Sequence, residues 1–349
     1  MKIFRKVSHP MPAALRAGVS VAVPLLVVLV ADRPEWSMYA AFGAFTSLYG
    51  RTRSGRPRLI MQAGAAAALI TAVLLGVLVG SLAERNWPAV AVVGLVAAAG
   101  TAIATAEQWH PPGALFLTFA FGAVASAPHH LADVPAAAGV ASASAAFSLL
   151  VGSLRGRRPA GGRTGRPPVE RGDAEPGRVW HRLRAVDVRE AVWCGVAASV
   201  AGIVATGLGI GHPYWATVAA VAPLSVAGRS ARLLRAGHRI GGTLVGLVAA
   251  AGVLALGLGP YPAILALAVL QIGAELVVGR HYGLAMVFIT PLALLMNQMA
   301  APRAISELLW DRGVETAVGA AVACAVILLA APRARGPAPR RVGEGPGSR

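Results

Sequence analysis

The chain has 349 residues, of which 56% are hydrophobic and only 13% are charged, and its mean hydropathy is +0.63. Soluble domains carry roughly 25% charged residues, so this composition excludes a soluble enzyme and indicates a membrane protein. The net charge of +17 would favour nucleic acid binding only if no other pattern explained where the basic residues lie.

Twelve apolar segments follow one another along the chain. They cover residues 13–31, 34–49, 59–83, 87–106, 111–127, 134–154, 189–207, 212–227, 240–258, 260–278, 283–299 and 313–331. A full helical span needs roughly 20 residues, so the shortest segments predict tilted, broken or partly re-entrant helices. Because the segments lack the two-residue alternation of barrel strands, we predict an all-α polytopic membrane protein with ten to twelve transmembrane helices.

The basic residues are distributed unevenly between alternate loops. If the N-terminus lies inside, 28 of the 32 Lys and Arg residues fall in inner segments. The outer loops then hold only Arg33, Arg85, Arg303 and Arg312. Cytoplasmic segments of membrane proteins retain Lys and Arg in this way. The pattern predicts a multi-pass protein of the plasma (inner) membrane with both termini cytoplasmic, and it removes the main support for nucleic acid binding.

One long polar break divides the chain. Residues 155–187 are rich in Arg, Gly and Pro and too poor in apolar residues to form a core, which predicts a cytoplasmic linker. This linker separates a first transmembrane half, residues 1–154, from a second half, residues 188–331. Residues 332–349 are expected to be a disordered basic tail. The first apolar segment is interpreted as a retained helix rather than a secretory signal, because a similar segment opens the second half.

Several landmarks recur in the two halves and indicate an internal repeat. The recurring pairs are Pro34-Glu-Trp36 with His212-Pro-Tyr-Trp215, Gly76/Gly80 with Gly242/Gly246, and His110/Phe116/Thr118 with His281/Phe288/Thr290. Glycines four residues apart share one helix face and let two helices approach closely. Each half has six segments, an even number, so the prediction is two parallel six-helix repeats with a pathway between them.

Three stretches of the second half carry a family resemblance. They are His212-Pro-Tyr-Trp-Ala-Thr-Val, Arg235-Ala-Gly-His-Arg-Ile-Gly-Gly-Thr-Leu-Val-Gly246 and Arg280-His-Tyr-Gly-Leu-Ala-Met-Val-Phe-Ile-Thr-Pro291. With these stretches the chain resembles the fusaric acid resistance protein-like (FUSC) integral membrane transporters, which are related to aromatic acid exporters and aluminium-activated malate transporters. The resemblance implies export or passage of organic anions, particularly aromatic carboxylates. Long exporters of the family work with a periplasmic adaptor, and the short linker here leaves such a partnership open.

The sequence points to no cofactor and no ATP-hydrolysing site. The only lysines are Lys2 and Lys6, so the chain contains no phosphate-binding loop of the Gly-x-x-x-x-Gly-Lys type. His129-His130 with Asp133 is too small a group for a metal site. Coupling to an ion gradient, passive passage or a partner ATPase are the remaining energy sources.

An anion site within a membrane needs positive charge or oriented donors. Arginine contacts a carboxylate through two parallel hydrogen bonds, and aromatic side chains can line the path of an aromatic substrate. A Thr-Pro pair inside a span frees backbone carbonyls that can face a cavity. The candidate substrate-binding residues are Arg56, Arg58, Arg235, Arg239, Trp215 and Thr290. The alternatives are topology signals for the arginines, an interface anchor for the tryptophan and a simple kink for the proline.

Two carboxylate and imidazole pairs mark a candidate route for protons. Glu275 precedes His281, and Glu107 precedes His110, each near the predicted cytoplasmic mouth. Histidine titrates near neutrality, and a desolvated glutamate can be shifted towards the same range, so such a pair can pass a proton. The alternative is an interfacial pair at a helix end.

These observations predict a membrane transporter, not an enzyme, that exports organic, particularly aromatic, carboxylates and is proton-coupled. Two alternatives stay open: a passive anion channel, and a non-transporting scaffold or assembly protein. The expected partners are the lipid bilayer and a small organic anion, and homo-oligomerisation stays open.

Overall fold

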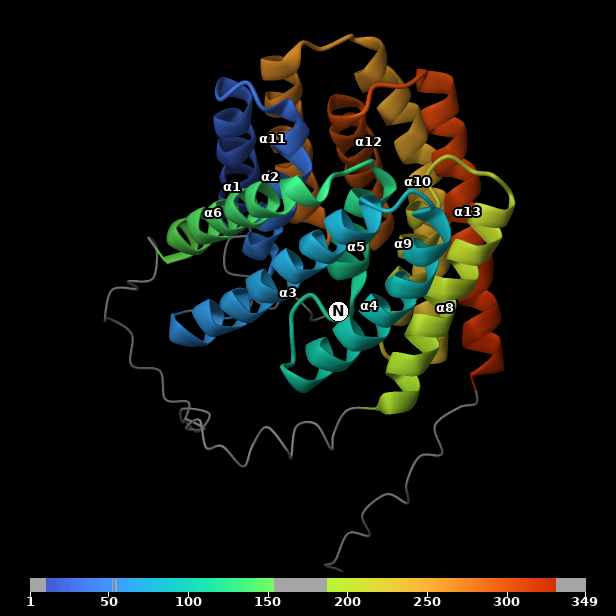
Figure 1. The fold of residues 1–349 in the computed structure, drawn as a ribbon. Coiled ribbons are helices and arrows are strands. Elements are labelled where there is room, and N and C mark those ends of the chain that lie inside the picture. The colour runs from blue at the N-terminus through green and yellow to red at the C-terminus, as the bar shows by residue number, and fades with distance from the viewer. Residues whose placement is uncertain (1–10, 52, 54, 154–186, 331–349) are drawn as a thin grey trace, which may run out of the picture.

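The computed structural model describes residues 11–51, 53, 55–153 and 187–330, so the expected tail and all of the expected linker except Asp187 lie outside the described residues. The helices of the first half are α1 (Met11–Val30), α2 (Ser37–Ala44), α3 (Arg56–Gly80), α4 (Asn86–Ala106), α5 (Leu115–Ser126) and α6 (Val134–Ser153). Those of the second half are α8 (Val188–Gly207), α9 (Tyr214–Leu224), α10 (Arg229–Ala255), α11 (Pro260–Val277), α12 (Tyr282–Ala300) and α13 (Ile305–Leu329). Short 3-10 segments lie at Pro34–Trp36, Phe45–Leu48 and Leu131–Asp133. Figure 1 shows the helices gathered into one bundle.

The described part of the chain is all-helical, as predicted, and it forms a multi-pass membrane protein. Nine of its helices have at least 18 residues and are apolar enough to cross a bilayer. The apolar helices α5 and α9 are shorter. The second predicted span is broken, because 3-10 segments flank α2 on both sides.

Two helices begin well before the apolar segments that predicted them. α10 begins at Arg229 rather than at residue 240, and α13 begins at Ile305 rather than at residue 313. Arginines lower the local mean hydropathy, so a segment predicted from hydropathy ends where they occur. An amphipathic helix can include such residues when their charged side chains share one face. The prediction that Arg312 lies in an outer loop is therefore wrong, because it lies inside α13 and is buried.

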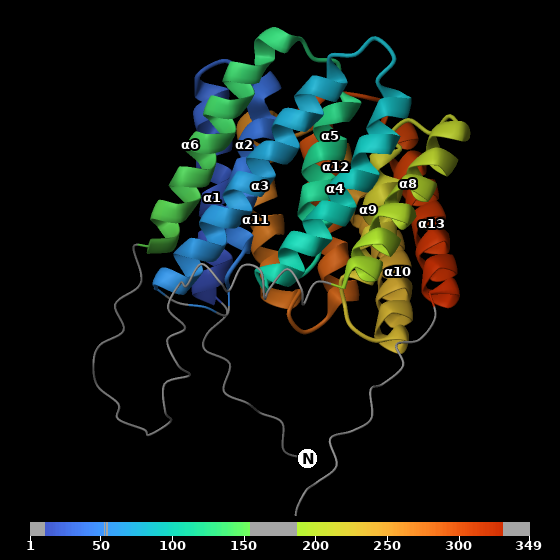
Figure 2. The ribbon, with the colours of Figure 1, turned by 60° about the horizontal axis from the view of Figure 1, so that its bottom comes forward.

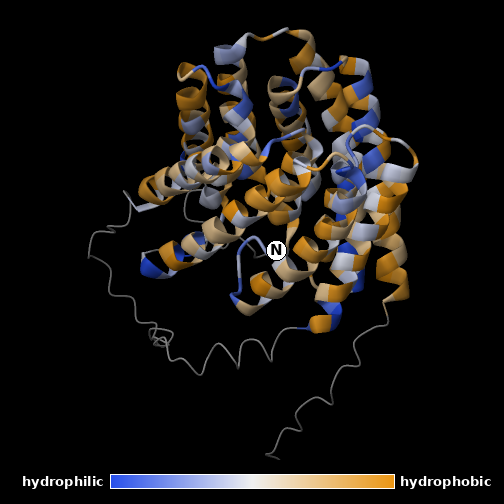
Figure 3. Cartoon of the chain, in the orientation of Figure 1, coloured by the Kyte–Doolittle hydropathy of each residue, from blue (hydrophilic) through white to orange (hydrophobic). Residues whose placement is uncertain are grey.

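The helices run between two ends of the bundle (Figure 2). At the end that we name the basic end, α3 and α10 begin near the arginines at 51–58 and 229–239. At the opposite end, named the far end, α9 and α13 begin after the loops at 208–213 and 301–304. Large apolar side chains such as Leu95, Val248 and Leu265 are exposed, where a bilayer would cover them. Hydrophobic residues predominate along the helices in Figure 3.

The predicted close approach of two helices is confirmed at Gly76, Gly242 and Gly246, whereas Gly80 packs against the loop residues Ala127 and His129. In the first half, Gly76 of α3 packs against Phe121 and Val124 of α5. In the second half, Gly242 and Gly246 of α10 pack against α12, where a methyl group at either position would overlap atoms of that helix. Small residues thus let α3 approach α5 and α10 approach α12.

Glycines also line the two main contacts between the halves. α1 packs against α11, where Gly18 meets Ile272, and α4 packs against α8, where Gly94 meets Gly195 and Ser199. Between α4 and α8 the side chains are small, so backbone lies close to backbone, whereas between α1 and α11 the Ile272 side chain fills the space beside Gly18. Near the far end, two hollows described below interrupt the contacts between the halves, and both are lined by Tyr214.

His129 fixes α2 to α5 at the far end and should make the stability of the protein depend on pH. Its Nδ1 lies 3.1 Å from the Tyr39 hydroxyl, and its Nε2 lies 3.0 Å from the Val124 carbonyl oxygen. Burial lowers the pKa of His129 below its usual value of 6.5. As the pH falls below 6.5 the unfolded chain therefore takes up a proton first, and the folded state loses stability until the lowered pKa is reached.

We expect the melting temperature in detergent to fall between pH 7.5 and 5.5, and to fall less in His129→Gln. The exposed His238→Gln should behave as wild type, and an equal fall in all three proteins would refute this role.

Candidate functional site

Three charged side chains in the described part of the chain are almost completely buried, and all three belong to the second half. Arg239 of α10 is 3% exposed, Arg312 of α13 is 1% exposed, and Glu315 of α13 is 0% exposed. Charges at membrane depth are costly, and in transport proteins they mark substrate or ion pathways. We refer to these three residues as the buried charge cluster.

The two arginines reach the cluster from opposite ends of the bundle. At a rise of 1.5 Å per residue, Arg239 lies about 15 Å from the start of α10, and Arg312 lies about 10 Å from the start of α13. α10 starts at the basic end and α13 at the far end. Both guanidinium groups therefore lie in the interior of the bundle, where Arg239 repels Arg312 and Glu315 attracts it.

One tyrosine of α12 holds two arginines of α10. Arg235 and Arg239 are four residues apart and share a helix face. The Arg235 guanidinium lies 3.9 Å from the centroid of the Tyr282 ring, and Arg239 Nη1 donates to the Tyr282 hydroxyl at 3.0 Å. Arg239 Nη1 also lies 4.0 Å from the sulfur of Met286. The Nε of Arg239 is buried and has no hydrogen-bond partner among the described residues.

Arg312 is held by stacking rather than by hydrogen bonds. Its guanidinium carbon lies 3.9 Å from the centroid of the Trp215 ring, a geometry that a planar cation favours. Its Nε and Nη1 are buried, and neither has a hydrogen-bond partner in the described part of the chain. Two donors of a buried cation are thus available to an acceptor that the protein does not itself supply.

Glu315 lies one turn beyond Arg312 on the same helix. Its Oε1 accepts a hydrogen bond from the backbone nitrogen of His212 at 2.9 Å, whereas its Oε2 is buried and has no partner among the described groups. Arg312 and Arg303 attract the carboxylate, and Asp311 repels it. With two arginines and one glutamate ionised, the cluster carries a net charge of +1.

Neutral donors surround the charges. The hydroxyls of Thr243 in α10 and Thr290 in α12 are buried without a partner in the described structure, as is the Trp215 indole nitrogen. The Tyr214 hydroxyl accepts from Asn297 Nδ2 at 2.9 Å. A net positive cluster with unpaired donors can hold an anion, because a carboxylate would neutralise the charge and satisfy the donors.

The loops at the far end form an ionic network above the cluster. Arg303 Nη1 lies 3.0 Å from His212 Nδ1 and 3.3 Å from Asp311 Oδ2. His212 Nδ1 lies 3.7 Å from the same Asp311 oxygen. Burial, followed by repulsion from Arg303, lowers the pKa of His212 below its usual value, so the ring is neutral at neutral pH. This network connects the solvent at the far end with Glu315.

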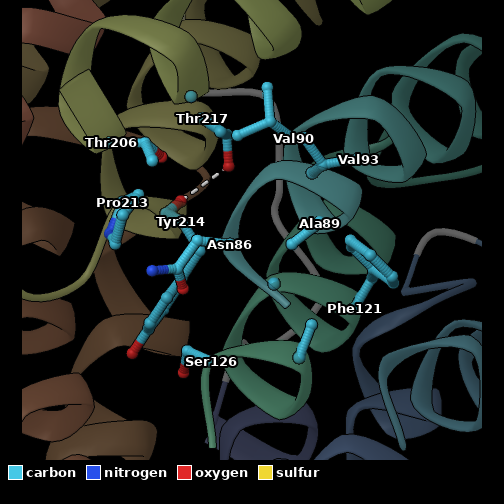
Figure 4. Close-up of a pocket in the computed structure, with 13 residues that line it drawn as sticks. Asn86, Ala89, Val90, Val93, Phe121, Ser126, Thr206, Pro213, Tyr214 and Thr217 are labelled. Atoms are coloured by element: carbon cyan, nitrogen blue, oxygen red, sulfur yellow. Dashed lines mark hydrogen bonds between the residues drawn. The ribbon is translucent and has the colours of Figure 1, made fainter. Parts of the chain in front are cut away.

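Two hollows border the aromatic residues beside the cluster. The larger, of about 400 Å³, lies between α4, α5, α8 and α9 and is lined by Phe121, Tyr214 and Thr217 among others (Figure 4). The smaller, of about 210 Å³, is lined by Trp215, Phe119 and Asn297 among others. Trp215 thus lies between an apolar hollow and Arg312. An aromatic ring beside a guanidinium offers the two kinds of group that an aromatic carboxylate would contact.

The structure gathers four of the six candidate substrate-binding residues around the cluster. Arg239 belongs to the cluster, Arg235 shares Tyr282 with it, and Trp215 stacks on Arg312. Thr290 is buried against Gly246 on α12, about one turn from Met286. The other two candidates lie elsewhere: Arg56 is exposed at the start of α3, and Arg58 lies beside Gly152 of α6.

The candidate proton-coupling residues lie at the basic end, away from the cluster. Glu275 of α11 accepts a hydrogen bond from Arg51 at 2.6 Å, an ion pair that joins the two halves. His281, Glu107 and His110 are exposed, and within the described residues no hydrogen bond or ion pair joins Glu275 to His281. The proposed route through these residues stays a prediction.

Arg312 and Glu315 are the functional candidates that sequence reasoning missed. Both lie in Trp310-Asp-Arg-Gly-Val-Glu315, which hydropathy assigns to a loop and the first turn of a span. A signal was available, because Arg312, Glu315 and Gly319 recur at helical spacing and so share one face with the small residues that follow. No three His, Cys, Asp or Glu residues of the described chain are placed to hold a metal ion.

The comparisons with known proteins single out the same half. Residues 199–326 match the family model described as fusaric acid resistance protein-like. The matching segment contains Trp215, Arg239, Arg312 and Glu315. No curated protein and no solved structure matches the chain. The match and the nine long apolar helices together indicate a membrane protein of the transport class.

Proposed function

We propose that this protein exports organic anions, particularly aromatic carboxylates, across the plasma membrane and binds them at Arg312 and Arg239. The observation that carries the proposal is the buried charge cluster, in which two arginines present unpaired donors inside the bundle. A buried donor without a partner is costly, so a site that keeps several is best explained by a ligand that satisfies them. The likeness of residues 199–326 to fusaric acid resistance proteins supports a small aromatic acid as the ligand.

We also propose that residues 1–154 and 188–331 are two parallel six-helix repeats with both chain termini cytoplasmic. The support is that equivalent helices have equivalent neighbours. α3 packs on α5 as α10 packs on α12, and α1 packs on α11 as α8 packs on α4. The basic end is then the cytoplasmic face, because the arginines gather there. Among the described residues, the almost completely buried charges belong to the second copy, which supports an anion site built mainly from that half.

Flux measurements in proteoliposomes test the function. Labelled benzoate, salicylate and succinate are followed with and without an imposed pH gradient. We expect saturable flux of at least one aromatic acid, and a loss of about 10- to 100-fold in Arg239→Ala, because a hydrogen bond to a charged group contributes about 1.5–3 kcal/mol. Arg56→Ala, which removes an exposed arginine at the start of α3, is the matched control and should keep wild-type flux.

Other outcomes would replace the proposal. Flux that does not saturate and follows the membrane potential would indicate a passive channel. No flux of any acid, from protein that remains folded, would indicate a non-transporting membrane protein. Glu275→Gln, measured in the same assay, reports whether the ion pair with Arg51 matters for flux.

A further inference from the structure

Resting on the proposed transport of anions, we propose that each anion crosses the membrane together with one proton, which Glu315 holds. The cargo is then an electroneutral pair of one carboxylate and one proton. Proton and anion move in the same direction and are released on the same side.

Glu315 is the acidic side chain best placed for this role. It is 0% exposed, and its Oε2 has no hydrogen-bond partner among the described residues. Glu275, by contrast, forms an ion pair with Arg51 at 2.6 Å. An unpaired carboxylate oxygen in a buried site can accept a proton without breaking an existing bond.

Charged and titratable groups face Glu315 from the surrounding elements. Arg312 and Asp311 lie on its own helix, and Tyr214 lies on α9. His212 and Arg303 belong to the loops at the far end. Arg239 of α10 and Tyr282 of α12 interact electrostatically with Arg312. Glu315 and Asp311 are the acidic groups of this set, and Asp311 is already within 3.3 Å of Arg303.

The charges determine whether proton binding to Glu315 favours or opposes anion binding at Arg312. An ionised Glu315 attracts Arg312 and repels a carboxylate that approaches the same arginine. A protonated Glu315 neither occupies Arg312 nor repels the substrate. Proton binding to Glu315 and anion binding to the arginines therefore favour each other, and this linkage is reciprocal. In a carrier that exchanged a proton for the anion, binding of the proton would instead have to disfavour binding of the anion.

A path for the proton leads to the far end. The exposed fractions of the side chains are 61% for Glu307, 33% for Arg303, 14% for Asp311 and 9% for His212, and Glu315 lies below them with no exposure. Successive members lie within 4 Å of one another as far as His212. The backbone of His212 then contacts Glu315. This network extends from exposed groups at the far end to Glu315, so the far end is the side from which a proton would reach Glu315.

The direct test follows protons and anions at once. Proteoliposomes that contain wild-type protein and a trapped pH-sensitive dye release a labelled acid that the protein carries, and protein-free liposomes correct for passive leakage. We expect one proton to leave with each anion, and a potential imposed with potassium and valinomycin to have no effect. Anion flux without proton movement, or with protons moving in the opposite direction, would overturn the coupling and leave the proposed transport intact. No flux of any acid would remove the transport itself.

Single substitutions test whether Glu315 is the side chain that holds the transported proton. Glu315→Gln mimics the protonated side chain, so it should bind the anion equally well from pH 5.5 to 8, move no protons and respond to the membrane potential. Glu84→Gln removes an exposed carboxylate between α3 and α4, outside this network, and should behave as wild type. If Asp311→Asn loses proton movement while Glu315→Gln keeps it, the assignment to Glu315 is wrong. If Glu315→Gln does not fold, the proton-to-anion ratio of the wild type still decides the coupling.

Discussion

Replacing Arg312 with methionine is expected to abolish anion transport and to destabilise the protein by about 3 kcal/mol, because the change leaves Glu315 without its neighbouring cation in a buried site. The guanidinium is 1% exposed and stacks on Trp215 at 3.9 Å, so no solvent can replace it. Methionine has similar length and fills the same space, so the loss reports the charge rather than a cavity.

The double variant Arg312→Met/Glu315→Met separates stability from function. Replacing both members of a buried charged pair with apolar residues is often neutral or stabilising. We therefore expect the double variant to regain the melting temperature of the wild type while transport stays lost. The coupling energy from the thermodynamic cycle, measured by thermal unfolding in detergent, should be on the order of 2–3 kcal/mol. Strictly additive effects of the two substitutions would show that the residues do not interact.

Lysine at position 312 provides the control for geometry. Arg312→Lys keeps the positive charge but loses the planar guanidinium that stacks on the indole ring and offers parallel donors. It should retain most of the stability and lose most of the transport. Full transport by this variant would mean that position 312 supplies only charge.

The sequence predicted Arg239 but not Arg312, and the difference has a physical origin. Arg239 lies directly before the apolar segment that begins at residue 240, so it was placed at the entrance to a predicted helix rich in small residues. Arg312 lies between the polar residues Asp311 and Glu315, where a hydropathy window cannot distinguish a loop from a buried polar turn. Burial of that turn depends on the loop 208–213, which lies about 100 residues away in the chain and packs over it.

The glycine pairs illustrate what local spacing can predict. Gly242 and Gly246 share one helix face because of helix geometry alone, and a close helix contact at that face was correctly expected. Which helix makes the contact depends on tertiary packing, and the spacing carries no information about it. The ion pair between Arg51 and Glu275 was missed for the same reason, since its members are 224 residues apart.

Gly242→Ala and Gly241→Ala, two identical changes at adjacent positions of α10, are expected to have opposite effects. A methyl group at Gly242 would overlap the backbone carbonyl oxygen of Gly283 and lie 2.7 Å from Cβ of Met286, so α12 must move away from α10. Overpacking of this kind costs typically about 1–3 kcal/mol. Because Met286 also contacts Arg239, the displacement should reduce anion transport together with the melting temperature.

Gly241 is exposed, and a methyl group there would meet nothing within 4 Å. Alanine is favoured over glycine within a helix by roughly 0.5–1 kcal/mol, and this gain applies equally to both positions because it arises from helix propensity and the unfolded chain. The melting temperature should therefore rise slightly in Gly241→Ala and fall in Gly242→Ala. Since the two substitutions share chemistry, helix and unfolded state, the difference between their melting temperatures measures the contact between α10 and α12 alone. Equal melting temperatures would show that α12 yields to the methyl group without cost, and the close approach would then not be needed to hold Tyr282 and Met286 against Arg239.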